Sequence, residues 1–272
     1  MRMYLVRGKA ENGYHELVPQ ENAAGLRWIS FGHLRLGPRE VHEAAVPGRE
    51  VVLVLLSGAM RVSIDNHTFG PYERPNVFAA QATAVYVPVG RPFRVENAGD
   101  GVLEVAVCQA VAEEVHEPFV VTPDQVQVKT VGQANFERKV HDIVVQQAEG
   151  RVHRIIVGET FNPPGNWSSY PPHKHDEYIP GVEALMEEIY FYQLDPPQGF
   201  GLQSIYTSDG AIDETYRVRH GDAFMIPRGY HPVCAAGGYQ LYYLWLMAGP
   251  VDRVMIPHDD PAHAWVRERS WG

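Results

Sequence analysis

The chain has 272 residues, of which 45% are hydrophobic, 11% aromatic and 21% charged, a composition typical of a folded globular protein. Its 23 Lys and Arg residues against 33 Asp and Glu residues give a formal net charge of −10, which argues against nucleic acid or an anionic membrane as the main partner. The longest apolar runs, 51–56 and 241–248, are too short to span a membrane, and two cysteines without a secretory signal pattern predict a cytoplasmic protein.

Short strand-like runs follow one another along the chain. Each is rich in Val, Ile, Leu or Tyr and is bounded by Gly, Pro, Asn or Asp. They lie at residues 49–56, 60–64, 84–88, 103–109, 153–161, 188–194, 201–207, 222–227 and 239–246. Because helical periodicity is not sustained beyond one or two turns, the sequence predicts an all-β sandwich or barrel rather than an alternating α/β fold.

A weak internal duplication divides this pattern into two halves. In the first half EVVLVL at 50–55 is followed by AVYVPVG at 84–90, and in the second half EIYFY at 188–192 is followed by AFMIPRG at 223–229. A polar, proline-containing stretch at 113–130 separates the halves. We therefore expect two β-barrel domains, residues 1–124 and 125–272, joined near Asp124.

Candidate metal ligands gather in the second half. His173 and His175 are separated by one residue, so both imidazoles point to one side of an extended chain. Glu188 begins a strand-like run, and His231 follows a Pro-x-Gly turn at 227–229. Three imidazoles and one carboxylate suit a divalent ion, for which zinc is our first choice and manganese, iron or nickel are alternatives.

The first half lacks the corresponding nitrogen ligands. It reads Pro-Val-Gly-Arg-Pro at 88–92 where the second half has Pro-Arg-Gly-Tyr-His at 227–231, and no H-x-H precedes Glu50. We therefore expect the first barrel to bind no metal and to serve a structural or interfacial role.

The ligand order, H-x-H, then Glu at a strand start, then a Pro-x-Gly turn with a nearby His, is the two-part signature of cupins. The second half further resembles the 5-deoxy-glucuronate isomerase family of inositol catabolism through NWSSYPPHKHD at 166–176, EEIYFY at 187–192, PPQGF at 196–200, DET at 213–215, PRGYHPV at 227–233 and GYQLYYLWLMAGP at 238–250.

The resemblance implies a bicupin, related to the uronate ketol-isomerase of pectin breakdown, that interconverts an aldehyde sugar acid and its ketose isomer. The implied reaction converts 5-deoxy-D-glucuronate to 2-deoxy-5-keto-D-gluconate. By position, the family's metal ligands fall on His173, His175, Glu188 and His231.

The chain departs from the family pattern at three positions near the expected site. Gln193, Ser204 and Trp245 stand where family members typically have Arg, Arg and Asn, and whether these changes alter substrate specificity is left open. In addition, the 12 residues at 176–187 between the second histidine and the glutamate predict an inserted loop that overhangs the site, either as a lid or as a disordered excursion.

An aldose–ketose isomerase moves a proton between neighbouring carbons, so it requires acid/base groups. Strand alternation from Glu188 places Tyr190 on the ligand's face, and Tyr190 is the first catalytic candidate, followed by Lys174. Arg228 is a candidate for the substrate carboxylate. Four further candidates for contacts with the sugar are Gln203, Tyr192, Tyr206 and Tyr243, although each of them can equally serve the packing of the barrel.

Two other functions are compatible with this ligand set. A cupin dioxygenase uses the same cage around Fe²⁺, and a sugar-sensing module binds a sugar without turnover. The intact ligand set, the acidic charge and the absence of an appended DNA-reading helix argue against the sensor. Activity without oxygen would exclude the dioxygenase. We expect a small sugar acid as the partner, no nucleic acid or membrane partner, and a homo-oligomer.

Overall fold

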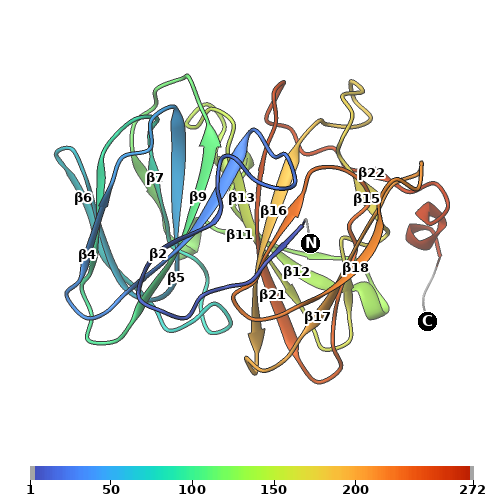
Figure 1. Ribbon diagram of the computed structural model, residues 1–272, viewed down its shortest axis with the longest axis horizontal. Helices are drawn as coiled ribbons and strands as arrows, with labels where there is room; N and C mark the ends of the chain where they lie inside the picture. Colours follow the sequence, from blue (N-terminus) through green and yellow to red (C-terminus); the bar gives the residue numbers. More distant parts are fainter. Residues whose placement is uncertain (1–3, 270–272) are drawn as a thin grey trace.

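The computed structural model describes residues 4–269 of this β-rich chain (Figure 1). Within that range the chain forms strands and four short 3₁₀ helices, η1 (Pro123–Gln125), η2 (Ala134–Phe136), η3 (Gln146–Ala148) and η4 (Ala264–Arg267), and no α-helix. The all-β prediction is therefore confirmed. None of these helical turns has the length and hydropathy required to cross a lipid bilayer.

The first half is built around one long strand. β5 (Arg49–Ile64) covers both runs predicted at 49–56 and 60–64, and its register shifts between Leu55 and Ser57, beside Gly58 in a left-handed conformation with φ 94°. Its first part pairs with β7 and β9, and its second part with β6 and β8. The strands of this half are β2 (Gly13–Val18), β3 (Ile29–Leu36), β4 (Val41–Ala44), β6 (His67–Arg74), β7 (Ala84–Val87), β8 (Phe93–Asn97), β9 (Leu103–Val111) and β10 (Phe119–Val121).

The second half contains a seven-stranded sheet, a four-stranded sheet and a strand pair. Their orders are β1-β19-β16-β21-β13-β12-β11, β14-β20-β17-β18 and β15-β22. The strands are β1 (Leu5–Val6), β11 (Gln127–Val131), β12 (Arg138–Val144), β13 (Ile156–Asn162), β14 (Trp167–Ser168), β15 (His173–Lys174), β16 (Glu187–Asp195), β17 (Gly201–Tyr206), β18 (Asp213–Val218), β19 (Ala223–Ile226), β20 (Val233–Ala235), β21 (Gln240–Ala248) and β22 (His258–Asp259).

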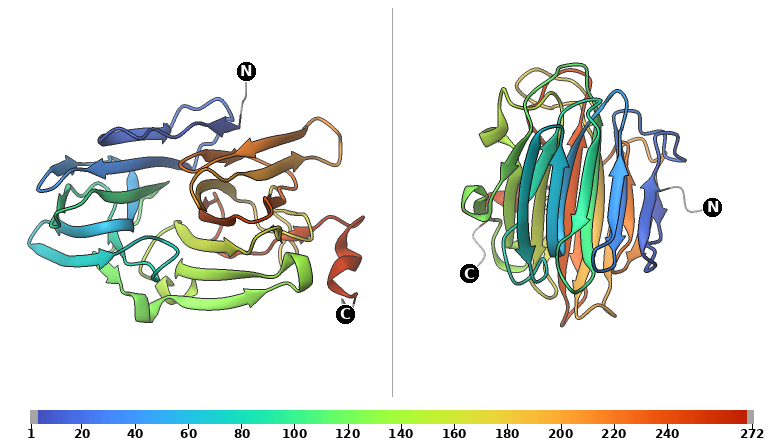
Figure 2. Two further views of the ribbon diagram at one scale, coloured as in Figure 1. Left: turned by 90° about the horizontal axis from the view of Figure 1, so that it is seen from below. Right: turned by 90° about the vertical axis from the view of Figure 1, so that its left-hand side faces the viewer.

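The chain crosses from one half to the other through η1. β10 pairs with β7 of the first half, whereas β11 pairs with β12 of the second. The N-terminal strand β1 crosses in the opposite direction and pairs with β19, so the first residues described extend the second-half sheet. Figure 2 shows the two halves side by side, with the N-terminal segment laid across both.

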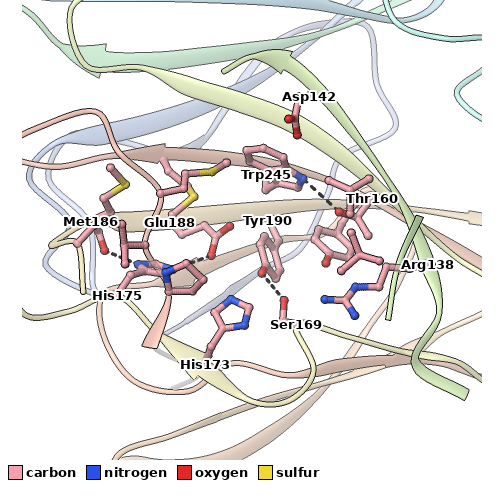
Figure 3. Close-up of a pocket in the computed structure, with 18 of the residues that line it drawn as sticks. Arg138, Asp142, Thr160, Ser169, His173, His175, Met186, Glu188, Tyr190 and Trp245 are labelled. Atoms are coloured by element: carbon pink, nitrogen blue, oxygen red, sulfur yellow. Dashed lines mark hydrogen bonds and ion pairs between the residues drawn. The ribbon is translucent and has the colours of Figure 1, made fainter. Parts of the chain in front are cut away.

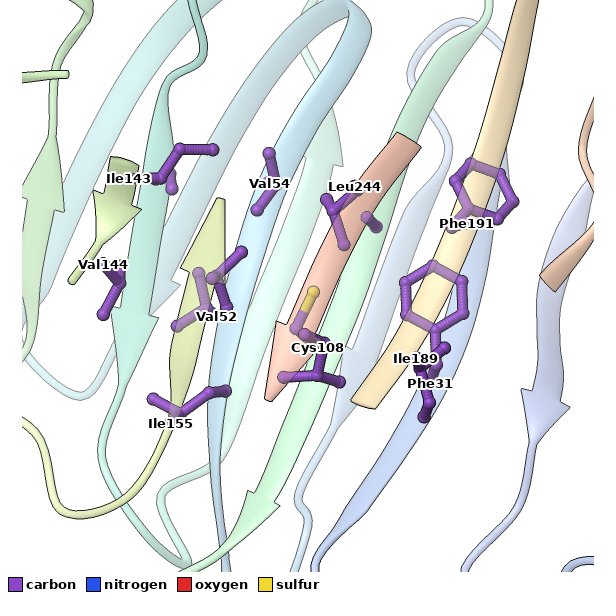
Figure 4. Close-up of a cluster of buried hydrophobic side chains, with 14 of the residues drawn as sticks. Phe31, Val52, Val54, Cys108, Ile143, Val144, Ile155, Ile189, Phe191 and Leu244 are labelled. Atoms are coloured by element: carbon purple, nitrogen blue, oxygen red, sulfur yellow. The ribbon is translucent and has the colours of Figure 1, made fainter. Parts of the chain in front are cut away.

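The two halves share a continuous apolar core. One buried cluster combines first-half residues such as Val52 and Cys108 with second-half residues such as Phe191 and Leu244 (Figure 4). A second cluster lies inside the second barrel, and a third fills the first barrel with residues such as Leu53 and Val105. Burial of this common face holds the halves together as layers of one molecule.

A buried ion pair also joins the halves. Arg74 and Glu159 are both fully buried, with Nη1–Oε1 and Nη2–Oε2 distances of 2.7 and 3.1 Å. The remaining guanidinium hydrogens reach the carbonyls of Leu55, Val77 and Ala80, and Glu159 also accepts a hydrogen bond from Tyr242. Every part of this pair is therefore compensated by hydrogen bonds, as a buried charge requires.

Candidate functional site

A cavity of about 300 Å³ lies inside the second barrel (Figure 3). Its walls are strands on which every second side chain points inward, as strand geometry requires. The residues that line it are Lys129, Val131, Arg138, Val140, Asp142, Thr160, Ser169, His173, His175, Ala184, Met186, Glu188, Tyr190, Tyr243, Trp245, Met247, Met255, Ile256 and Pro257. The cavity volume is at the lower end of the range of about 300–1,000 Å³ typical of small-molecule sites.

Three of the four predicted metal ligands meet at one end of this cavity. His175, Glu188 and His231 offer ligand atoms that all lie within 4.8 Å of one another. Oε2 of Glu188 is 3.1 Å from Nε2 of His175 and 3.2 Å from Nε2 of His231. Glu188 is 4% exposed, His175 is 5% exposed and His231 is fully buried. The cluster is therefore shielded from bulk water.

Local structure sets the direction of each of these ligands. Glu188 occupies the second position of β16, where alternation sends it inward while Ile189 packs in the core between the halves. His231 follows a turn at Gly229, whose φ is 91° and where a Cβ would lie 2.5 Å from the carbonyl oxygen of Tyr206. The Pro-x-Gly signal in the sequence therefore corresponds to a turn that only glycine fits.

Hydrogen bonds to backbone carbonyls fix the tautomer of both histidines. Nδ1 of His175 is 2.8 Å from the carbonyl oxygen of Met186, and Nδ1 of His231 is 2.9 Å from that of Gly229. A carbonyl only accepts, so Nδ1 carries the proton and the Nε2 lone pair of a neutral ring faces Glu188. Two lone pairs directed at one carboxylate repel it unless a cation lies between them, and this donor set fits a divalent metal ion.

The electrostatics of the cluster likewise favour positive charge. Burial opposes ionisation of Glu188, but the imidazoles of His175 and His231 beside it outweigh burial when Nε2 carries a proton, and they lower the pKa of Glu188 to about 2. Burial also opposes charge on His175, yet the hydrogen bond with Glu188 raises the pKa of His175. The cluster is thus an anionic carboxylate with two nitrogens that hold a proton or a metal ion.

His173 lies beside this cluster and outside its 4.8 Å limit. Its ring centroid is 4.9 Å from that of His231 and 6.4 Å from that of His175, and it lines the same cavity. Burial, together with the neighbouring His231 and His175, holds the pKa of His173 well below its ordinary range. A neutral imidazole in this position can supply the fourth donor.

The hydroxyl groups of the cavity form two pairs next to the metal ligands. Tyr190 is within 2.7 Å of the Ser169 hydroxyl, and its ring centroid is 6.0 Å from that of His231. The ring of Tyr243 packs against that of Tyr190, with centroids 4.3 Å apart and the planes tilted by 37°, and its hydroxyl pairs with Ser168. Burial, and after it the charge of Glu188, raises the pKa of Tyr190 well above its ordinary value, so this phenol is neutral.

Two predicted basic residues lie away from this cavity. The ammonium of Lys174 is 2.6 Å from Asp176 and 2.9 Å from Glu183, because alternation turns it away from the cavity face that His173 lines. Arg228 is exposed and lies 3.6 Å from Asp209. Neither residue lines the cavity, so the structure does not bring these cations to the metal ligands.

Three predicted sugar contacts also lie outside the lining of the cavity. The Tyr192 hydroxyl donates to Gln203 over 2.6 Å, and Gln203 in turn donates to the carbonyl of His231 over 2.8 Å. Tyr206 donates to Asp260 over 2.7 Å. Gln203 therefore supports the backbone of His231, a predicted metal ligand, whereas Tyr243 is the member of this predicted set that lines the cavity.

The inserted loop at 176–187 is held by internal hydrogen bonds. Glu183 accepts bonds from the backbone N–H groups of Asp176 and Glu177, at 2.8 and 2.9 Å. Asp176 also accepts a bond from the N–H of Gly229 over 2.7 Å, which ties the loop to the turn before His231. The loop is an ordered element of the site, contrary to the alternative of a disordered excursion.

The sequence reasoning missed Arg138, which is 7% exposed and lines the cavity from the first position of β12. It also missed Thr160 and the pair formed by Lys129 and Asp142. Of the three positions that depart from the family pattern, Trp245 lines the cavity, and its indole N–H donates to Thr160 over 3.1 Å. The sequence offered no clear signal for them, because the cavity-facing positions of β12 are Arg138, Val140 and Asp142 rather than a row of apolar residues.

Comparisons with known proteins agree with this architecture. The model of the KduI/IolB family matches residues 4–266. A 5-deoxy-glucuronate isomerase of Geobacillus kaustophilus is 38% identical over 248 residues, which cover 90% of this chain and 88% of that protein. A 5-deoxy-glucuronate isomerase of Listeria monocytogenes is 37% identical over 247 residues, which cover 90% and 89%.

Solved structures show the same fold. The crystal structure of an IolB-like protein from Salmonella typhimurium matches with a TM-score of 0.90 and 32% identity, covering 97% of this chain and 99% of that one. A deletion mutant of Bacillus subtilis oxalate decarboxylase matches with a TM-score of 0.62 and 13% identity, covering 93% and 77%. The second likeness shows the bicupin fold alone.

Proposed function

The chain belongs to the KduI/IolB family, and from this premise we propose that it converts 5-deoxy-D-glucuronate to 2-deoxy-5-keto-D-gluconate with the help of one divalent metal ion. Its curated relatives are isomerases, and this chain is an isomerase of the same family. The observation that supports the substrate and metal assignment is a cavity lined by His173, His175, Glu188 and Tyr190, with His231 beside it, 3.2 Å from Glu188.

The reaction moves two hydrogens within the sugar. A proton leaves C2, next to the C1 aldehyde, and a proton arrives at C1, while the C2 hydroxyl becomes the ketone and the C1 oxygen becomes a hydroxyl. Negative charge develops on the two oxygens along the way. A divalent ion held by the three histidines and Glu188 would supply Lewis-acid stabilisation of that charge, worth several kcal/mol in such sites; zinc is our first choice.

Tyr190 is the protein's own candidate for acid catalysis. Because its pKa is raised, the phenol keeps its proton at neutral pH and donates it, or a hydrogen bond, to a sugar oxygen. The hydroxyl of Ser169, within 2.7 Å, orients the phenol through a hydrogen bond. The neighbouring Tyr243 ring packs against Tyr190 and would help to shield the reacting carbons from bulk water.

The experiment is an NMR assay of candidate sugar acids in deuterated water with purified, metal-loaded protein. We expect the aldehyde signal of 5-deoxy-D-glucuronate to be replaced by that of the ketose under anaerobic conditions, with deuterium at the carbon that changes oxidation state. Chelation or His231→Ala should abolish turnover, whereas His67→Ala, an exposed histidine of the first barrel, should not.

The same assay separates the alternatives. Turnover that stops without oxygen would favour a dioxygenase. Tight binding of the sugar acid without turnover in the metal-loaded protein would favour a sensor. Either result would overturn the proposed isomerisation.

A further inference from the structure

The cavity has a basic group at the end opposite the metal ligands. Arg138 begins β12, is 7% exposed and lines the same cavity as His175 and Glu188. Figure 3 shows Tyr190 and Ser169 between the histidines and the Arg138 guanidinium. A molecule that reaches from the metal ligands past Tyr190 therefore meets Arg138.

The Arg138 guanidinium is only partly satisfied by the protein. Its Nη1 donates to the carbonyl oxygens of Phe136 and Tyr170, each over 3.1 Å. Within residues 4–269, no carboxylate lies within 4.0 Å of it, and Nε and Nη2 have no hydrogen-bond acceptor. The two carbonyls fix the orientation of the side chain, and Nε and Nη2 are left to bond a ligand in the cavity that Arg138 lines.

The buried Arg74 provides the contrast. Its guanidinium makes two bonds with Glu159 and three with backbone carbonyls, so its charge is compensated within the protein. A buried guanidinium without such a partner is costly. Arg138 is such a buried guanidinium without a carboxylate partner, and it lies at the wall of the cavity. A bound anion would supply the negative charge that compensates it.

Other cations near the site are already occupied or face elsewhere. Lys129 is paired with Asp142, and Lys174 is paired with Glu183 in the inserted loop. Among the cations that line this cavity, Arg138 is thus the one whose guanidinium has donors without an acceptor, namely Nε and Nη2. The planar edge that carries these two nitrogens matches the two oxygens of a carboxylate.

We propose that Arg138 binds the carboxylate of the sugar acid through Nε and Nη2, and that this contact makes the enzyme select uronates over neutral aldoses. The inference rests on the proposed function in one respect, namely that the substrate's carbonyl end lies at the metal ligands. The carboxylate at the far end of the six-carbon chain then reaches the opposite wall. Arg138 would be a substrate-binding residue and would fix the reacting carbons beside Tyr190.

The test compares two substrates on the metal-loaded enzyme. 5-Deoxy-D-glucuronate carries the carboxylate, and 5-deoxy-D-glucose has a neutral CH₂OH group in its place. The quantity measured is the ratio of kcat/KM for the acid to kcat/KM for the neutral sugar, because this ratio does not depend on the fraction of enzyme that is folded. The variants are Arg138→Gln and Arg138→Lys, with Arg61→Gln, which removes a half-exposed pair with Glu96 in the first barrel, as the matched control.

We expect Arg138→Gln to lower the ratio roughly 10- to 100-fold, as for the loss of hydrogen bonds to a charged group. Arg138→Lys should retain part of the selectivity, since lysine keeps the positive charge but lacks the two parallel N–H donors of the guanidinium. Arg61→Gln should retain all of the selectivity. An unchanged ratio in Arg138→Gln, or a ratio that falls in Arg228→Gln instead, would overturn the inference.

A binding measurement distinguishes failure of this inference from failure of the proposed function. Calorimetric titration uses the acid obtained by reducing the aldehyde of 5-deoxy-D-glucuronate to CH₂OH. This acid keeps the carboxylate at the far end of the chain and cannot isomerise, so it reports binding of an acid whether or not the protein turns over any sugar. If the wild-type protein binds this acid and Arg138→Gln binds it at least tenfold more weakly, Arg138 binds the carboxylate, even if the protein isomerises no sugar. Equal binding by both proteins would refute the role of Arg138 and leave the isomerase proposal standing.

Discussion

Replacement of His33 by leucine should stabilise the protein, and increasingly so as the pH falls. His33 lies on β3, is 4% exposed and packs against Phe191 of the second half at a ring distance of 5.0 Å. Neither ring nitrogen has a hydrogen-bond partner in the described range, and Nε2 is 3.9 Å from Oε2 of Glu104. Burial, and after it the charge of Arg35, lowers the pKa of His33 from 6.5 to about 3.

The sign and the size follow from proton linkage. Between pH 3 and 6.5 the unfolded chain binds a proton at His33 that the folded protein does not bind, so the folded state loses stability as the pH falls. The difference between a pKa of 6.5 in the unfolded chain and about 3 in the folded protein corresponds to about 5 kcal/mol of lost stability below pH 3. At pH 5 the loss is about 2 kcal/mol. Leucine has a similar volume and no proton to bind, and it also removes two unsatisfied polar atoms.

The assay is urea denaturation of the wild type and His33→Leu at pH 7 and pH 5. The difference in free energy of unfolding between the two proteins should grow by about 2 kcal/mol from pH 7 to pH 5. His67→Leu, which changes an exposed histidine, serves as the control and should show no such growth. A difference between wild type and His33→Leu that does not change with pH would refute the reasoning.

Three further predictions concern the site and the interface between the halves. Tyr190→Phe should lower kcat about 100-fold or more by removing the acid, and it should leave the amount of bound metal unchanged. Turnover is followed by NMR and the bound metal by elemental analysis. Loss of metal in this variant would contradict the assigned role of Tyr190. Arg74→Met should destabilise the protein by about 3–5 kcal/mol because Glu159 is left buried and unpaired. In chemical denaturation the double variant Arg74→Met/Glu159→Leu should recover most of that loss. No recovery would show that the lost packing, rather than the unpaired charge, causes the destabilisation. Zinc affinity should fall as the pH drops below the raised pKa of His175, since a proton competes with zinc for Nε2. Competition titrations with a zinc indicator should show weaker binding at pH 6 than at pH 8. Equal binding at the two pH values would contradict this prediction.

The convergence of His175, Glu188 and His231 could be predicted because its signals are local. The H-x-H spacing, a glutamate at a strand start and a glycine turn before a histidine each describe a short stretch of backbone. Period-two alternation along β16 then fixes which side of the sheet Glu188 and Tyr190 share, and the structure has Ile189 and Phe191 in the opposite core. The duplication likewise indicated two barrel halves, since it follows the same alternation twice.

Residues brought in by strand pairing could not be predicted in this way. Arg138 reaches the cavity because β12 pairs with β13, and its strand reads RKVHDIV, in which charged residues hide the apolar alternation. Lys174 illustrates the opposite case, since proximity to ligands in sequence suggested a role, while the inserted loop supplies Glu183 as its partner. The crossing of the two-residue strand β1 to the second-half sheet leaves no periodic signal at all.

The central claim is that one divalent ion on His173, His175, Glu188 and His231 is required for isomerisation. The most direct measurement is the rate of 5-deoxy-D-glucuronate isomerisation by chelated, metal-free protein as zinc is added back. Activity should be absent at the start and should reach its plateau at one zinc per chain, with Glu188→Gln failing to respond. Full activity in metal-free protein, or the same response in Glu188→Gln, would contradict the account.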